Sequence, residues 1–575
     1  MSRFISNINF NLTRFYIFFI KQRFKIIYIL VLFGIYWLNT FHTNFPDEFD
    51  NIVGGWYITQ GKLPYIGFFS HHNPGAYVIA ALITLITHRS FVGFRMIWSI
   101  LLFFSSIGGY WLIRSKCGKR ETFFYAIFLL FLSLSATYYW GHMLLSETVV
   151  GYLFLPAYVL FLIKGLKSQK INLTDIVAIS ILTSLALLTS FTFLFAIGIF
   201  LIYCIYLFIQ SVGFSRKLIQ GIGILVAPYV LFVSYLLISH SFTEYVFQAI
   251  TYNKLYYIYN FPIINGQVST NPLRYAVSIF YNTNIQFHSL LVQLDHLNFS
   301  RPLNVTLILG NAVLLIYFLT KRKFSLTIMA YLVFVYLNAR GEPLGSQETD
   351  FHSTVYIMIS LVNLSIILRL LIDEIGKKLL PPYHLLYKLL LVLTGAYAIF
   401  TGLFFLRTFS EKAYAKYMGQ APGIYDEPVV APIINKIVNK NDYFWIGPFE
   451  FQELLYINGK LPSKYHWFLP AHERSTKIKN EFTADLLKNR PKLIVYKEDL
   501  SYFSTDAHSF NYPIVNFLRE YYFRLEDLEK LGQKYRPTIT NLHNFDIAVN
   551  FYYDKNRKEE IIKNLLDQKI IEAVK

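Results

Sequence analysis

The chain has 575 residues, of which 54% are hydrophobic and only 15% are charged, and its mean hydropathy is +0.40. Soluble globular proteins carry about 25% charged residues, so this composition excludes an ordinary soluble protein. The formal net charge is +18. Residues 1–406 hold 28 Lys and Arg against 13 Asp and Glu, whereas residues 407–575 hold 25 against 22. A basic excess that lies in the apolar part, mostly in its short loops, is typical of membrane topology signals and excludes a nucleic-acid-binding groove.

The first 25 residues carry five basic side chains and are followed by an apolar run with no small-residue cleavage site. We therefore expect a signal anchor that is not cleaved. The chain has only two cysteines, Cys117 and Cys204. This number excludes a disulfide framework and a metal site built from thiolates.

Apolar runs close to the 20 residues that a membrane-spanning helix needs recur through residues 1–406. The first extends from residue 26 to about 41, with basic residues before it and Asp47, Glu48 and Asp50 after it. This charge distribution predicts a cytoplasmic N-terminus. Ten further spans are predicted at 92–113, 122–140, 148–163, 174–189, 191–212, 218–238, 304–320, 324–339, 353–371 and 386–406. The sequence thus predicts an all-α polytopic membrane domain of about eleven transmembrane helices.

The loops between these runs alternate in charge. Basic or mixed loops, predicted to be cytoplasmic, are 114–121, 164–172, 213–217, 321–323 and 372–385, and the opposite loops carry acids. The positive-inside rule supports this register. The register requires that the short run 75–87 does not cross the bilayer, so we expect an interfacial or re-entrant helix there. Large outer loops are then 42–91 and 239–303, and the C-terminus lies outside the cell.

Residues 407–575 are predicted to form a small soluble α/β domain on the extracytoplasmic side. Residues 443–446 and 493–496 have the pattern of buried strands, with helical stretches near 427–439, 449–457 and 474–488. The acids Asp442, Glu450 and Glu453 in this domain are interpreted as ordinary surface charges.

Polar side chains with catalytic potential gather in the outer loop that follows the first predicted span. Asp47, Glu48 and Asp50 lie within a few residues of the hydrocarbon, where a carboxylate is usually paired or functional. One carboxylate could act as the general base that deprotonates an attacking hydroxyl. A phosphate leaving group would need cationic or metal partners. Candidates on the same predicted side are His71, His72, Arg95 and Arg340.

Simpler interpretations of these residues stay open. Asp47 could cap a helix that starts near Glu48, and Glu48 could be a solvated charge. A divalent metal ion held by Asp47, Glu48 and His72 is another alternative, although paired histidines in a loop are often plain hydrogen-bonding residues. Arg95, one turn into its span, either binds phosphate or extends to the aqueous surface.

Two later segments on the same predicted side extend this group. A single outer loop holds Arg340, Glu342, Glu348, Asp350 and His352. This loop either contacts a substrate or is simply solvated, since loops are generally polar. His142 and Glu147, near the end of the third predicted span, could line the same region.

These motifs resemble the GT-C membrane glycosyltransferases, and within them the protein O-mannosyltransferase and aminoarabinose transferase branch, glycosyltransferase family 39. The resemblance rests on Asp47-Glu48, on the Gly-x-x-Pro-Tyr element at 61–65, on His72-Asn73-Pro74 and on Arg95. Residues 338–353 resemble a later outer loop of the family. Residues 445–462 resemble part of the soluble domain of its bacterial members.

The resemblance implies an inverting transfer of a sugar from a polyprenyl-phosphate donor to a glycan, lipid or protein acceptor, at the outer face of the cytoplasmic membrane. Asp47 would be the general base, with Glu48 as the alternative. Substrate-binding residues would be Asp50, Tyr65, His71, His72, Arg95, Arg340 and His352. The competing hypotheses are a transporter or flippase of lipid-linked sugars and a non-catalytic scaffold. A transporter should show repeat symmetry and ionisable residues at mid-membrane, whereas these acids cluster on one face.

Overall fold

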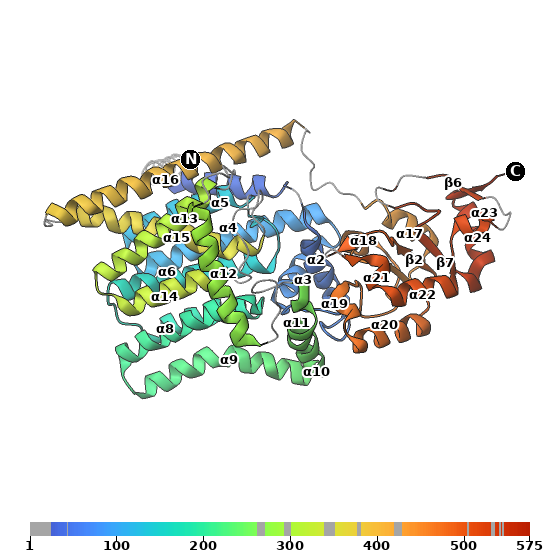
Figure 1. Cartoon of the computed structure of the whole chain (residues 1–575), viewed down its shortest axis with the longest axis horizontal. Helices are drawn as coiled ribbons and strands as arrows, with labels where there is room; N and C mark the ends of the chain where they lie inside the picture. Colours follow the sequence, from blue (N-terminus) through green and yellow to red (C-terminus); the bar gives the residue numbers. More distant parts are fainter. Residues whose placement is uncertain are drawn as a thin grey trace, which may run out of the picture.

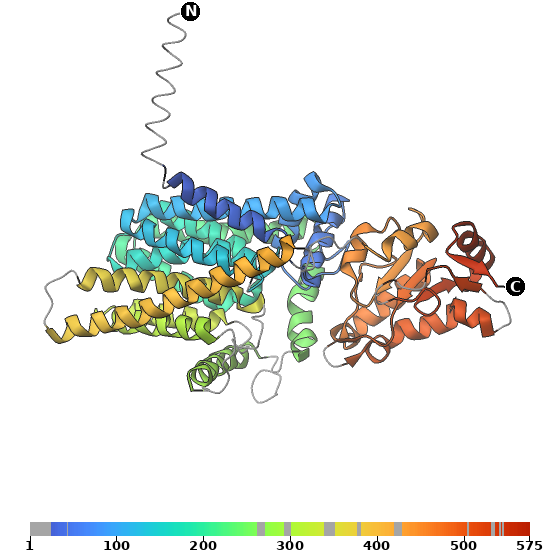
Figure 2. The same ribbon diagram turned by 90° about the horizontal axis from the view of Figure 1, so that it is seen from above.

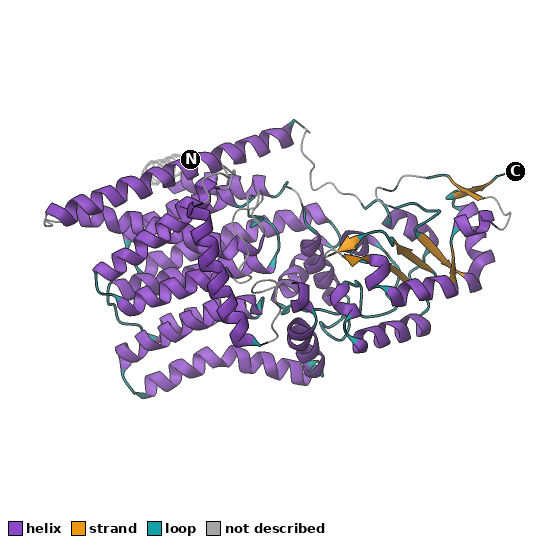
Figure 3. Cartoon of the chain, in the orientation of Figure 1, coloured by secondary structure: helices purple, strands orange, loops and turns teal. Residues whose placement is uncertain are grey.

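The structure, a computed structural model, has a body of long helices with an α/β domain beyond one end of it (Figures 1 and 3). It describes residues 23, 25–42, 44–137, 139–260, 271–292, 301–338, 351–375, 381–418, 428–502, 505–530, 535–539, 542 and 545–574.

The long helices lie side by side, and each of the eleven predicted spans coincides with one of them. They are Lys25–Asn39, α4 (Phe91–Lys116), α5 (Lys119–Ser135), α6 (Ser146–Leu166), α7 (Leu173–Leu187), α8 (Leu194–Val212), α9 (Arg216–Ile238), α13 (Arg301–Thr320), α14 (Phe324–Leu337), α15 (Thr354–Ile375) and α16 (Pro381–Tyr417). A further helix, α12 (Pro272–Val292), packs against α13 and α14.

Among the described residues, six helices are long and apolar enough to cross a membrane: α4, α6, α8 with the 3-10 turn before it, α9, α15 and α16. The protein is therefore a multi-pass membrane protein, and the total of eleven spans stays a prediction. Helices α6 and α15 are the most buried, whereas α16 lies along the outside of the bundle (Figure 2).

Ion pairs close the end of the bundle that lies far from the α/β domain (Figure 1). Asp175 is fully buried and pairs with Lys164 and, at 3.2 Å, with Lys116. Glu121 accepts from Lys167 at 2.6 Å and from Arg369 at 3.0 Å. The basic loops that were predicted to be cytoplasmic thus also join α4, α5, α6, α7 and α15 to one another, because buried charges need partners.

Two short helices, α2 (Pro46–Thr59) and α3 (Gly75–Thr87), lie between the bundle and the α/β domain (Figure 1). They pack closely because glycines line their contact. A Cβ atom on Gly54 would lie 2.3 Å from the Tyr77 ring, and one on Gly55 would lie 2.5 Å from the Ala80 Cβ. Helix α3 has 13 residues, which span about 20 Å and are too few to cross a bilayer. This length agrees with the helix predicted at 75–87.

The segments that follow α9 form short helical turns that lie against the α/β domain. They are α10 (Phe242–Tyr245), the π-helical turn η2 (Val246–Thr251), α11 (Tyr252–Leu255) and the 3-10 turn η3 (Tyr257–Asn260). The 3-10 turns η1 (Phe191–Phe193) and η4 (Phe351–Ser353) precede α8 and α15.

The α/β domain is built on a four-stranded sheet with the order β1-β2-β7-β5. Strands β1 (Phe444–Gly447) and β2 (Leu493–Tyr496) are parallel, and β7 (Phe551–Asp554) and β5 (Tyr522–Phe523) add antiparallel neighbours. The two predicted buried strands are confirmed, since every residue of β1 and β2 is buried. Two-stranded pairs are formed by β3 (Ser501–Tyr502) with β4 (Thr505–Asp506), and by β6 (Tyr535–Pro537) with β8 (Ile571–Ala573).

Short helices cover this sheet: α17 (Ala431–Ile437), α18 (Phe451–Tyr456), α19 (Pro470–Glu473), α20 (Thr476–Lys488), α21 (Ala507–Phe510), α22 (Tyr512–Tyr521), α23 (Leu525–Lys530), the 3-10 turn η5 (Lys555–Arg557) and α24 (Lys558–Asp567). Helix α16 continues to Tyr417, beyond the residue-406 boundary expected for the membrane domain. The extra turns are polar enough to be solvated, with Arg407 and Glu411 exposed and paired.

The three acids that were predicted to be surface charges are not ordinary surface residues. Glu453 accepts the N–H groups of Val429, Val430 and Ala431 at the start of α17, at 2.6–3.2 Å. Asp442 pairs with Arg557 at 2.9 Å. Burial, together with the negative charge of Glu453, raises the pKa of Glu450 to about 8. The surface-charge interpretation was wrong because it ignored backbone donors and tertiary neighbours.

The predicted topology can be tested by labelling engineered cysteines in a Cys117→Ser/Cys204→Ser background. We expect Asp499→Cys, whose side chain is 76% exposed in the α/β domain, to react with an impermeant maleimide in intact cells. Phe214→Cys, 93% exposed at the opposite end of the bundle, should react only after lysis. The reverse pattern would contradict the predicted sidedness.

Candidate active site

Asp47 and Glu48 lie in the first turn of α2, which begins at Pro46. The N-cap is Phe45, which makes no capping hydrogen bond through its side chain. Asp47 is therefore not the N-cap, because it already has a helical conformation. A carboxylate in this position is stabilised by the positive end of the helix dipole. Asp47 is partly exposed, whereas Glu48 is fully buried.

Glu48 forms a buried ion pair with Arg95 of α4. Arg95 Nη2 lies 2.5 Å from Glu48 Oε2, and both side chains are 0% exposed. The backbone N–H of Leu144 donates to Glu48 Oε1 at 3.1 Å. Burial raises the pKa of the Glu48 carboxyl, and Arg95 and the Leu144 N–H oppose that effect. Glu48 is therefore not a solvated charge, and Arg95 does not extend to the surface. Phosphate binding by Arg95 stays a prediction.

An aromatic cluster brings the 3-10 turn η4, directly before α15, to the start of α2. The Phe45 ring lies 4.7 Å from Trp140 and 5.4 Å from Phe351, and Trp140 and Phe351 stack at 5.9 Å. His352 follows directly, with its ring 3.9 Å from that of Phe351. The cluster thus places His352 in the same region as Asp47. Arg340, predicted from the same loop, lies outside the described residues.

The charges of three cations act on His42, which precedes Asp47 by five residues in the sequence. Burial lowers the pKa of His42, and the nearby charges of Lys412, Arg95 and Lys416 lower it further, to about 4. His42 is therefore neutral at pH 7.

The segment between α5 and α6 holds these groups together. Lys412 Nζ donates to the carbonyl of Thr137 at 3.4 Å. The ring of His142, from the same segment, lies 6.0 Å from that of His42. Sequence reasoning missed Lys412 and Lys416 because it assigned them to the soluble domain. The available signal was their i,i+4 spacing, which puts both on one face of a helix that continues an apolar run.

The His71-His72 pair lies in the connection between α2 and α3. The two rings are 3.8 Å apart, and the His71 ring also lies 4.6 Å from Tyr257 and 5.5 Å from Trp467 of the α/β domain. Asn253 Nδ2 donates to the His71 carbonyl at 2.7 Å. The pair therefore lies where α2, α11 and the α/β domain meet.

The described residues Asp47, Glu48 and His72 do not form a metal site in the structure. In the part of the chain that the structure describes, no three His, Cys, Asp or Glu side chains come together as metal ligands. Glu48, one of the three suggested ligands with Asp47 and His72, is already bound to Arg95. A metal at these three residues therefore does not fit the geometry.

Asp50 and Tyr65 have partners within the protein. Asp50 Oδ2 accepts the Tyr77 O–H at 2.9 Å, and its Oδ1 lies 3.5 Å from His466 Nε2 of the α/β domain. The buried Tyr65 O–H donates to the His72 carbonyl at 2.9 Å. These contacts support the α2–α3 connection, and direct substrate binding by either residue stays a prediction.

Comparison with solved structures finds ArnT from Cupriavidus metallidurans. Its apo crystal structure has a TM-score of 0.44 and 12% sequence identity, with 83% of this chain and 93% of that chain covered. The crystal structure bound to undecaprenyl phosphate has a TM-score of 0.46 and 11% identity, with 82% and 93% covered. ArnT belongs to the aminoarabinose transferase branch that the sequence motifs resemble. At TM-scores under 0.5, this similarity does not by itself establish a function. No family model and no curated protein match the chain.

The ion pair between Glu48 and Arg95 should be essential for stability. Arg95→Met leaves a buried carboxylate without its cation, and we expect a loss of about 3–5 kcal/mol, measured as a lower melting temperature of the purified protein in detergent. The double variant Glu48→Gln/Arg95→Met should recover most of that loss. As a matched control, Arg407→Met breaks an exposed ion pair with Glu411 and should leave the melting temperature almost unchanged, because solvent screens such pairs. Equal melting temperatures for Arg95→Met and the native protein would contradict this role.

Proposed function

We propose that the protein transfers a sugar from a polyprenyl-phosphate donor to an acceptor hydroxyl at the outer face of the membrane, with Asp47 as the general base. The observation that carries this proposal is the juxtaposition of charges at one end of the bundle. The partly exposed carboxylate of Asp47 directly precedes Glu48, which pairs with Arg95 at 2.5 Å, and Arg95, Lys412 and Lys416 are close enough to His42 to lower its pKa. An acid beside a cationic group suits a reaction that removes a proton and releases a phosphate.

The proposed transfer needs no group other than the two substrates, Asp47 and the nearby cations. The acceptor oxygen attacks the anomeric carbon of the donor sugar while its proton moves to Asp47. The bond between that carbon and the phosphate oxygen breaks, and its electron pair leaves with the polyprenyl phosphate. The negative charge of the leaving group grows in the transition state, so fixed cations nearby lower the barrier. Attack on the face opposite the leaving group inverts the anomeric configuration.

The surroundings of the two acids favour Asp47 over Glu48 as the base. Both Glu48 oxygens are engaged, one by Arg95 and the other by the Leu144 N–H, and the side chain is fully buried. A general base must come within hydrogen-bond reach of the substrate proton. Asp47 is the neighbouring carboxylate that retains solvent exposure, so it can meet an acceptor.

Lys412 and Lys416 are suited to hold the donor phosphate. They belong to α16, whose apolar part is long enough to cross the bilayer and whose last turns extend beyond it. Cationic side chains at such a helix end lie at the level of lipid headgroups. A polyprenyl phosphate with its chain in the hydrocarbon would present its anionic group at this same depth.

A transporter fits the bundle less well. Polar contacts inside it involve neutral groups, such as Tyr36 with Ser106 and Tyr152 at 2.7 Å, and Asn311 with Asn363 at 2.8 Å. Within the described residues, the buried charges named above lie at the helix ends. Transport through the bundle usually requires a binding site near the bilayer midplane.

Replacing the proposed base tests this function directly. We expect Asp47→Asn, purified and reconstituted in lipid nanodiscs, to lose about 100-fold or more of its transfer rate, since general bases contribute about 10²–10⁴-fold. Release of polyprenyl phosphate from a radiolabelled polyprenyl-phosphate sugar measures that rate. Asp499→Asn, at an exposed position in the α/β domain, is the control. A normal rate for Asp47→Asn would exclude Asp47 as the base.

The proposed contact of Lys412 and Lys416 with the donor phosphate can be tested separately. Lys412→Ala should raise the KM for the polyprenyl-phosphate sugar by about tenfold, because one charge-assisted contact to phosphate contributes about 1.5–3 kcal/mol. Lys416→Ala should act in the same direction. Steady-state kinetics with the exposed control Lys488→Ala measures the effect. Unchanged kcat and KM in both variants would show that these lysines do not contact the donor.

A further inference from the structure

One glutamine side chain connects both ends of the turn that precedes the histidine pair. Gln248 Nε2 donates to the Tyr65 carbonyl at 2.7 Å, and Gln248 Oε1 accepts the Ser70 N–H at 3.0 Å. Gln248 is fully buried. Because Ser70 is followed directly by His71, these two bonds fix the start of the segment that carries the predicted substrate-binding histidines.

The backbone around Gln248 is unusual. Residues Val246–Thr251 form the π-helical turn η2, between the α-helical turns α10 and α11. A π-helical turn is rare and occurs frequently at functional sites. Here it lies directly against the α2–α3 connection, and its central residue bridges that connection.

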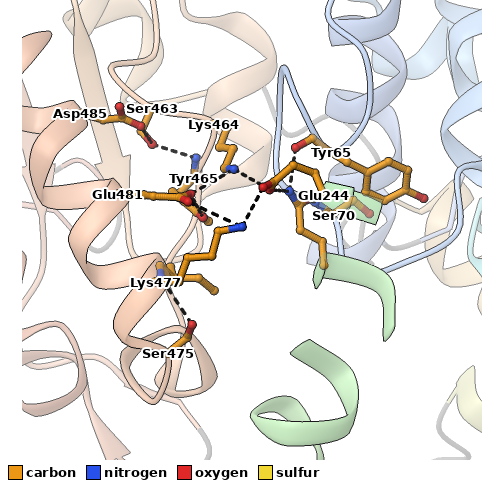
Figure 4. A network of polar contacts seen from close by, with 12 residues as sticks. Tyr65, Ser70, Glu244, Ser463, Lys464, Tyr465, Ser475, Lys477, Glu481 and Asp485 are labelled. Carbon is orange, nitrogen blue, oxygen red and sulfur yellow. Dashed lines mark hydrogen bonds and ion pairs between the residues drawn. The ribbon is translucent and has the colours of Figure 1, made fainter. Parts of the chain in front are cut away.

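Glu244, one turn earlier, links Gln248 to the α/β domain. Glu244 Oε2 accepts from Gln248 Nε2 at 3.0 Å and from Lys464 at 2.8 Å, and its Oε1 accepts from Lys477 at 2.7 Å. Figure 4 shows both lysines pointing from the α/β domain toward Glu244. Burial opposes ionisation of Glu244, but its hydrogen bonds to Lys464, Lys477 and Gln248 outweigh burial and lower its pKa to about 2.

The α/β domain also binds the same turn directly. The Phe69 N–H donates to the Lys464 carbonyl at 2.9 Å. Lys464 therefore contacts the turn through its backbone and Glu244 through its side chain. His466, two residues later, lies 3.5 Å from Asp50 of α2. The contacts between the two domains thus include the elements that precede and carry His71, namely α2 and the turn before the histidine pair.

We propose that Gln248 is a positioning residue for the transfer reaction, and that the α/β domain acts on the active site through Glu244, Lys464 and Lys477. This inference rests on the proposed function. Gln248 holds the 65–70 turn in one conformation, Glu244 orients the Gln248 amide, and the two lysines hold Glu244. The α/β domain is then a part of the active-site framework, rather than a separate module tethered to the enzyme.

A double-mutant cycle of kcat/KM tests whether Glu244 acts on the reaction through Gln248. In the full chain in nanodiscs, Gln248→Leu removes both bonds to the turn, and we expect at least a tenfold fall in kcat/KM. Glu244→Gln should give a smaller fall. The double variant should lose no more than Gln248→Leu alone, because residues acting through one another are not additive. Glu481→Gln, which contacts the lysines but not Gln248, is the matched control. If the losses of kcat/KM in the two single variants add up in the double variant, Glu244 does not act through Gln248 and the proposal is wrong.

Hydrogen exchange provides a readout that does not depend on activity. Gln248→Leu should speed exchange of the Ser70 amide by about tenfold while the amides of β1 and β2 keep their native rates. Unchanged exchange at Ser70 would overturn the positioning role, whatever the kinetics show. Faster exchange in a protein whose native form transfers no sugar would instead support the positioning of the turn and refute the proposed function.

Discussion

The ion pair between Glu48 and Arg95 is the interaction on which the arrangement of the site depends. It joins α2, which lies outside the bundle, to the first turns of α4, which belongs to it. The Leu144 N–H adds the segment between α5 and α6 to the same carboxylate. Two charges buried beside lipid are tolerated only when they are matched to each other. Their geometry therefore fixes where Asp47, the adjacent residue, is presented.

Charges are distributed differently at the two ends of the bundle. At the end far from the α/β domain, Asp175 and Glu121 pair with Lys116, Lys164, Lys167 and Arg369, and the result is a closed structural network. At the other end, cations gather around a neutral histidine beside one accessible carboxylate. The same side chain types thus form a closed network at one end and, at the other, a group of cations near a partly exposed carboxylate, where the local field can attract an anionic substrate.

Much of the fold could be predicted because its signals are local. Each membrane helix needs its own apolar run, and β1 and β2 are buried on both faces, so both are visible in short windows of sequence. Strand β5 was missed because it has only two residues and depends on pairing with β7. Helix α16 was cut short because hydropathy ends where the bilayer ends, whereas the helix continues into water.

The candidate site could be predicted only in part, for a related reason. The acids at the start of α2 are recognisable as a motif. The partner of Arg95 is not recognisable in the sequence, because an arginine can pair equally with a buried carboxylate or with a substrate phosphate. Lys412, Lys416 and Gln248 carry no motif at all. Their importance arises from neighbours that are distant in the sequence, such as Gln248 and Ser70, which are 178 residues apart.

The length of α16 has a mechanical consequence. Its 37 residues form one uninterrupted helix of about 55 Å, whereas the hydrocarbon layer of a bilayer is about 30 Å thick. The apolar part of the helix, residues 386–406, is about 32 Å long and matches this layer, so a thinner bilayer would require the helix to tilt. A tilt of α16 would displace its far end, where Lys412 lies, relative to the more buried helices α6 and α15. Lipid composition, through bilayer thickness, would thereby adjust the height of the proposed phosphate contacts above the acyl chains.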